Sequence, residues 1–151
     1  MDKLRYSVEV NAPVHAVWTT MLDDTTYREW TSAFHEGSYF EGSWELGSTI
    51  RFLGPNDDGS LGGMIAKVVE NRPNEYISLE YLGETVGGVD DTTSEAALRL
   101  AGAHENYSFR ESDGVTTVEV ELDSDDQFTA MFNQMWPPAL AKLKEIAEAA
   151  A

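Results

Sequence analysis

The chain has 151 residues, 42% of them hydrophobic and 11% aromatic, which is enough apolar material for the core of one domain. Ten Lys and Arg residues stand against 27 Asp and Glu residues, so the formal net charge is −17. Such a surface repels polyanions, so we expect neither nucleic acid nor an anionic membrane as a partner. The sequence has no cysteine, which excludes disulfides and thiol chemistry.

The first part of the chain predicts a strand followed by two short helices. Residues 4–10 alternate apolar and polar side chains, the pattern of a half-buried strand. Residues 11–13 end this strand, and Pro13 suits the first turn of a helix that continues to Leu22. A second short helix carries Trp30. We find no apolar run suited to a signal peptide or a membrane span, and therefore expect a cytoplasmic protein without membrane insertion.

From Gly37 onward the apolar residues recur with a period of two, and turn residues separate them at regular intervals. Consecutive strands joined by short turns predict an antiparallel sheet. The six strands are expected at residues 39–40, 49–53, 63–69, 76–82, 105–110 and 115–122. Residues 83–103 are rich in Gly and acidic residues, and within them 94–100 favour a short helix or a lid.

Residues 124–151 keep helical spacing of apolar side chains over many turns, which predicts one long C-terminal helix. Ser124 and Gln127 have the spacing of a capping box at its start. Pro137 and Pro138 lack the N–H groups that would bond to carbonyl groups one turn earlier. They predict a kink in this helix, or a helix that restarts at Pro137.

The predicted order of strand, two helices, six strands and a long helix indicates a single α+β domain over residues 1–151, with helices on one side of a curved antiparallel sheet.

Short motifs along the whole chain also carry a resemblance to a known family. They are residues 11–13 with Val17-Trp18, Trp30, Gly62-Gly63, and Trp136-Pro137 followed by Leu140 and Leu143-Lys144. In order and spacing they resemble the START-like or SRPBCC (Bet v 1-like) superfamily, which has the helix-grip fold. The chain looks most similar to the branch of activator of heat-shock-protein ATPase homologues.

This resemblance implies a deep apolar cavity between the sheet and the long helix. Relatives use the cavity to hold a small hydrophobic molecule such as a lipid, a polyketide or an aromatic metabolite. Methionine and aromatic side chains suit such an adaptable surface, although each of them at core spacing also fits an ordinary core position. The residues expected to contact the ligand are Trp30, Phe34, Phe52, Met64, Tyr81, Met131, Met135 and Trp136.

The residues leave catalysis open. His15, His35 and His104 are far apart in sequence and show no metal-ligand spacing, so we expect no metal, and no motif predicts a cofactor. An enzyme of the cyclase, dehydratase or hydrolase kind, as found in relatives, needs a polar residue such as His35, Tyr81 or Tyr107 in the cavity. A third alternative is a partner module that contacts a chaperone. Buried polar groups in the cavity would favour the enzyme. An all-apolar cavity would favour a carrier that binds its ligand without chemistry, and a filled interior would favour the partner module.

The acidic surface leads to a first testable prediction. Repulsion among the 27 acidic side chains should destabilise the folded state at low ionic strength. Salt screens these charges, with a Debye length of about 8 Å at 0.15 M, so the melting temperature should rise between low salt and 0.15 M NaCl. Differential scanning calorimetry measures this directly. A melting temperature that stays flat or falls would contradict the prediction.

Overall fold

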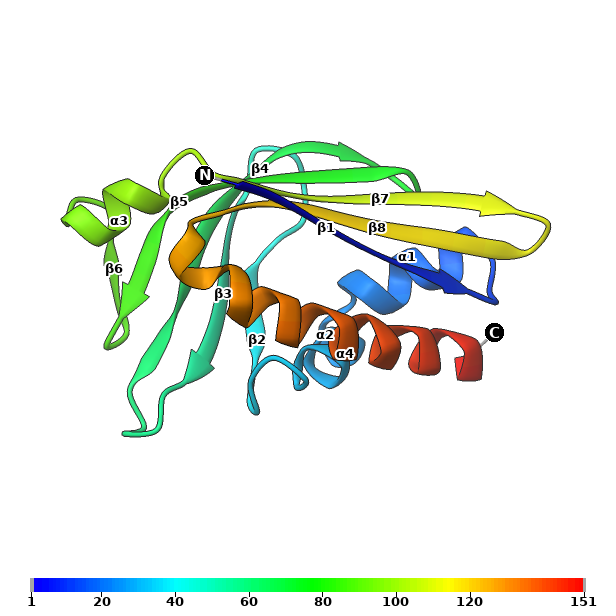
Figure 1. Ribbon diagram of the computed structural model, residues 1–151, viewed down its shortest axis with the longest axis horizontal. Helices are drawn as coiled ribbons and strands as arrows, with labels where there is room; N and C mark the ends of the chain where they lie inside the picture. The colour runs from blue at the N-terminus through cyan, green and yellow to red at the C-terminus, as the bar shows by residue number, and fades with distance from the viewer. Residues whose placement is uncertain (1, 151) are drawn as a thin grey trace.

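One antiparallel sheet organises the computed structural model, which describes residues 2–150 (Figure 1). Within these residues the sheet has eight strands in the order β1-β8-β7-β5-β4-β3-β2, and β6 pairs with β5 outside this path. The strands are β1 (Asp2–Val10), β2 (Tyr39–Gly42), β3 (Thr49–Pro55), β4 (Leu61–Arg72), β5 (Tyr76–Val86), β6 (Val89–Asp91), β7 (His104–Ser112) and β8 (Val115–Ser124). The predicted antiparallel sheet is confirmed, and β6 is a strand that the sequence analysis did not predict.

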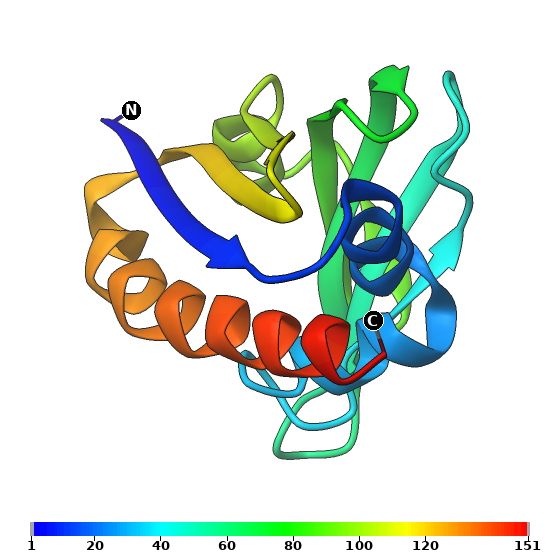
Figure 2. The same ribbon diagram turned by 90° about the vertical axis from the view of Figure 1, so that its right-hand side faces the viewer.

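Four helices complete the described part of the chain: α1 (Val14–Leu22), α2 (Asp24–Thr31), α3 (Glu95–Leu100) and α4 (Asp126–Ala150). The long helix α4 lies across the open side of the curved sheet and packs against β1, α1 and α2 (Figure 2). The short helix α3 packs against β5 and lies at the end of the molecule where α4 begins (Figure 1). The predicted α+β order is therefore confirmed, including a short helix within residues 94–100.

Alternation of side chains determines which face of the sheet is buried. On β8, Val118 and Val120 are fully buried and lie opposite Val8 and Tyr6 of β1. Between them, Glu119 points to the other face, because successive side chains of a strand alternate. Such a pattern fixes the register, since a slip by one residue would bury the charged face.

Close contact between β3 and β4 explains why Gly63 is a glycine. A Cβ atom at Gly63 would lie 1.8 Å from the carbonyl oxygen of Phe52, so no larger residue fits there. The register shifts of the β4–β5 pair lie further along, between Ile65 and Ala66 and between Val68 and Glu70. Gly63 thus permits close approach of two backbones, and the irregularities that bend the sheet occur at other residues.

The long helix α4 runs unbroken through Pro137 and Pro138, so the predicted restart at Pro137 is wrong. Both prolines are exposed, whereas Trp136 on the opposite side is buried. Water can therefore reach the carbonyl groups that lack an N–H partner, which lowers the cost of interior prolines.

The start of α4 also differs from the prediction. The N–H of Gln127 donates to Asp125 Oδ1 at 3.3 Å, so Asp125 caps the helix. Ser124 instead belongs to the end of β8. At the other end of the helix, the predicted final residue, Ala151, lies outside the described residues.

The two prolines give a second testable prediction. In the double variant Pro137→Ala/Pro138→Ala, new N–H groups can donate to the carbonyls of Asn133 and Gln134. The free energy of unfolding should rise by about 1–3 kcal/mol. This gain is smaller than the combined cost of two prolines in a helix interior, because water already solvates these carbonyls. Urea denaturation measures the change, and Pro73→Ala in the β4–β5 turn is the control that should bring no such gain. An unchanged or lower stability of the double variant would show that the prolines do not strain α4.

Candidate functional site

Aromatic rings from several elements surround the space between α2, β3 and α4. Phe34 packs edge-on against Trp136 with ring centroids 4.7 Å apart, and Tyr27 packs edge-on against Phe40 at 5.0 Å. The indole N–H of Trp30 donates to the carbonyl oxygen of Met21 at 3.0 Å, which fixes this ring in place. The rings therefore form a rigid apolar boundary.

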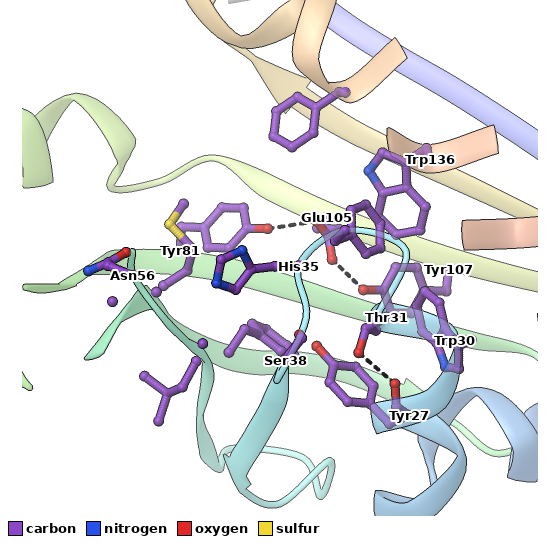
Figure 3. Close-up of a pocket in the computed structure, with 18 residues that line it drawn as sticks. Tyr27, Trp30, Thr31, His35, Ser38, Asn56, Tyr81, Glu105, Tyr107 and Trp136 are labelled. Atoms are coloured by element: carbon purple, nitrogen blue, oxygen red, sulfur yellow. Dashed lines mark hydrogen bonds between the residues drawn. The ribbon is translucent and has the colours of Figure 1, made fainter. Parts of the chain in front are cut away.

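A pocket of about 330 Å³ opens beside these rings (Figure 3). We call it the first pocket. Its apolar lining residues are Trp30, Phe34, Phe52, Leu53, Gly54, Gly62, Gly63, Met64, Phe132 and Trp136. Its polar lining residues are Tyr27, Thr31, His35, Ser38, Asn56, Tyr81, Glu105 and Tyr107. The pocket thus combines an aromatic surface with a small number of polar groups, the usual composition of a site for a small molecule.

The carboxyl group of Glu105 is the most unusual member of the first pocket. The residue is only 8% exposed. The hydroxyl of Tyr81 donates to its Oε1 at 2.7 Å, and the hydroxyl of Tyr107 donates to its Oε2 (Figure 3). Among residues 2–150, no basic side chain forms an ion pair with Glu105. The two tyrosines are therefore the hydrogen-bond donors that stabilise this buried acid.

Burial controls the electrostatics of this cluster. It raises the pKa of Glu105 above its ordinary value, and the hydrogen bonds from Tyr107 and Tyr81 oppose that rise. Burial, together with the nearby Glu105 charge, raises the pKa of both tyrosines, so they stay protonated and remain donors. An ionised carboxylate has about four acceptor positions, and the tyrosines occupy two of them. Glu105 thus retains acceptor capacity for a bound molecule.

Trp136 contributes a polar atom with no partner. Its Nε1 is buried and makes no hydrogen bond within residues 2–150. The nitrogen lies on the edge of the indole that faces Glu105 in Figure 3. A buried donor without an acceptor costs about 1–3 kcal/mol, so an acceptor on a bound molecule would recover that cost. Because this nitrogen is buried, a ligand atom reaches it only if the side chains around it move.

The predicted ligand-contacting residues are divided by the structure into three groups. Six of them line the first pocket: Trp30, Phe34, Phe52, Met64, Tyr81 and Trp136. Met131 lines a separate, second pocket of about 380 Å³. Met135 lines neither pocket. The residues of the second pocket are Met64, Tyr81, Glu84, Ala96, Arg99, Leu100, Leu122, Asp123, Ser124, Asp125, Gln127, Phe128, Met131 and Phe132.

The polar residues named from the sequence, His35, Tyr81 and Tyr107, all line the first pocket. His35 Nε2 donates to the carbonyl oxygen of Pro55, so this histidine has a backbone hydrogen-bond partner. Sequence reasoning missed Glu105, which it treated only as the start of a strand. The sequence could have indicated it, because residues 105, 107 and 109 fall on the same face of β7, and Tyr107 and Phe109 on that face are buried.

Comparison with known proteins places this geometry in a wider context. No family model and no curated protein matches the chain. Among solved structures, the Aha1 dimer from Colwellia psychrerythraea has a TM-score of 0.71 at 17% identity, covering 98% of this chain and 97% of that chain. The AHSA1-like protein from Aeromonas hydrophila has a TM-score of 0.69 at 18% identity, covering 97% and 94%. The chain has the helix-grip fold.

A third similar structure is larger. The di-domain ARO/CYC protein StfQ from the steffimycin biosynthetic pathway has a TM-score of 0.64 at 20% identity, covering 97% of this chain and 45% of that chain.

Within residues 2–150 of the helix-grip chain, no group of three or more acidic or histidine side chains is placed to hold a metal ion. Over the same residues, no helix has the length and apolar character needed to cross a membrane.

The raised pKa of Glu105 gives a third testable prediction. The folded state binds this proton more readily than the unfolded chain, so the contribution of Glu105 to stability falls as pH rises from about 4.3 through the raised pKa. Glu105→Gln cannot ionise. The free energy of unfolding of the variant minus that of the parent should therefore increase with pH across this window, by about 1.4 kcal/mol per unit of pKa difference.

Urea denaturation of both proteins between pH 4 and pH 8 measures this difference. Glu119→Gln, on the opposite face of neighbouring β8, removes one negative charge without touching the first pocket and corrects for the change in net charge. A difference for Glu105→Gln that stays flat or decreases with pH would contradict the assignment.

Proposed function

We propose that this chain binds a small, flat, largely apolar molecule in the first pocket and holds a hydrogen-bond donor of that molecule on Glu105. The observation that carries the proposal is the buried carboxyl group, which has spare acceptor capacity inside an aromatic-lined pocket. A volume of about 330 Å³ lies at the lower end of the range of ligand pockets. The helix-grip fold, shared with the ARO/CYC protein StfQ from the steffimycin biosynthetic pathway, agrees with this use.

Charge narrows the class of ligand. The net charge of −17 and the Glu105 carboxylate both repel anions. The aromatic side chains Trp30, Phe34 and Phe52 favour a flat ring system. A neutral phenol or alcohol, or an amine, meets these conditions. A carbonyl or ether oxygen on the same molecule would also suit the unpartnered Nε1 of Trp136.

A second candidate function is catalysis in the same pocket, which the buried polar residues Tyr81, Glu105 and Tyr107 favour. Burial raises the pKa of Glu105 toward the range in which a carboxyl group serves as a general acid or base. This supports a proton-transfer step of the cyclase or dehydratase kind, with Glu105 as the acid or base. Binding precedes the chemistry in either case. The chaperone-contacting alternative was associated with a filled interior, and the open pockets of this chain favour it less.

A pair of ligands gives the fourth testable prediction. The hydroxyl of 2-naphthol can donate to Glu105, whereas 2-methoxynaphthalene has a similar ring and no donor. A hydrogen bond to a charged acceptor contributes about 1.5–3 kcal/mol, so the parent should prefer 2-naphthol about tenfold or more. In Glu105→Gln the preference should shrink to a few-fold, because the acceptor is neutral.

Isothermal titration calorimetry measures the four dissociation constants as a cycle, which cancels the size difference between the ligands. Glu119→Gln is the matched control and should keep the preference of the parent. Equal binding of both ligands by the parent, or an unchanged preference in Glu105→Gln, would rule out Glu105 as the anchor.

A further inference from the structure

The second pocket lies where α3 and the start of α4 face β5. Its volume of about 380 Å³ slightly exceeds that of the first pocket. Met64, Tyr81 and Phe132 line both pockets, so these three side chains form the partition between them. Met64 and Phe132 are only partly buried, and methionine changes rotamer at low cost. Movement of these two side chains would join the two spaces.

We infer that the two pockets are compartments of one site, and that its ligand is elongated. The inference rests on the proposed function, since the ring and its donor occupy the first pocket. An unbranched apolar chain attached to the ring then passes Met64 and Phe132 and fills the second pocket. The role of residues 83–103 follows, because α3 supplies one side of that second compartment.

Exposed apolar side chains mark the opening of the second pocket. Phe128 and Met131, on the first turns of α4, are 42% and 40% exposed and line this pocket. Large apolar side chains grouped at the opening of a pocket are typical of a surface that an apolar ligand covers. A chain that extends beyond Phe132 would remove both of them from water, which supplies a driving force for binding.

The charges around the second pocket specify an uncharged chain. Glu84, Asp123 and Asp125 line it, against one basic residue, Arg99. A guanidinium nitrogen of Arg99 lies 3.6 Å from a carboxylate oxygen of Glu95 on the preceding turn of α3, so the charge of Arg99 is already partly neutralised. A fatty-acid carboxylate would thus meet a negative rim, while an alkyl chain without a terminal charge would not.

The backbone joins the α3 segment to the partition. The N–H of Tyr81 donates to the carbonyl oxygen of Ala103 at 2.8 Å, and the N–H of Gly102 donates to the carbonyl oxygen of Tyr81 at 2.9 Å. Tyr81 also lines both pockets and donates to Glu105. The end of the α3 segment is therefore hydrogen-bonded to the same residue that holds the polar anchor, and Tyr81 links the two compartments.

Chain length provides the test. Isothermal titration calorimetry would compare 4-methylphenol, 4-butylphenol and 4-hexylphenol, which share the ring and its donor. Each methylene buried in the second pocket should lower the dissociation constant about fourfold. Ala96→Trp, which narrows the second pocket from α3, should remove this dependence and leave 4-methylphenol binding unchanged. Leu98→Trp is the control, because Leu98 is 62% exposed and lines neither pocket.

Methionine methyl groups report where the chain lies. In a ¹³C-methyl-methionine NMR spectrum, 4-methylphenol should change the methyl chemical shift of Met64, and 4-hexylphenol should change those of both Met64 and Met131. Met135 lines neither pocket, so its methyl chemical shift should not change with either ligand. If 4-hexylphenol leaves Met131 unshifted, or if binding of the phenols does not improve with chain length, the second pocket is not part of the site. Failure of every phenol to bind would instead overturn the proposed function, and this inference with it.

Discussion

The contact of Trp136 with the rings beneath it is the interaction on which the rest of this structure depends. Trp136 projects from α4 and meets Tyr6 of β1, Trp30 of α2, Phe34, and Tyr107 of β7, with centroid distances from 4.7 to 6.3 Å. Rings of this size attach the helix to the sheet and also hold it away from the strands. Because the rings leave part of the enclosed space empty, the same contact that closes the fold creates the first pocket.

Glu105 shows how the site opposes the stability of the fold that carries it. A buried carboxyl group costs free energy when it has no basic partner, as Glu105 has none in the described part of the chain, and two tyrosine hydroxyls compensate for only part of its lost hydration. An apolar side chain at the same position would serve the core better. Residues that a fold keeps against its own stability are commonly those that act on another molecule.

The fold could be predicted because it depends on local patterns, whereas the site depends on contacts between distant residues. Alternation in 115–122 and helical spacing after 124 gave the sheet and α4. The sequence analysis did not find β6, which has three residues and pairs only with the end of β5. It also placed Met135 in the cavity, because spacing alone does not fix the angle of a side chain to the sheet. Glu105 becomes notable only once Tyr81, on another strand, is known to donate to it.

The pairing of β1 with β8 has a consequence for how the chain folds. Asp2 lies opposite Ser124 and Val10 opposite Thr116, so the first strand of the chain pairs with the last strand, β8. Contacts this distant in sequence lower the folding rate, and domains dominated by them fold in about milliseconds to seconds. Until β8 and α4 arrive, β1 exposes its apolar side chains and its free strand edge, so the unfinished chain is at its most aggregation-prone during this interval.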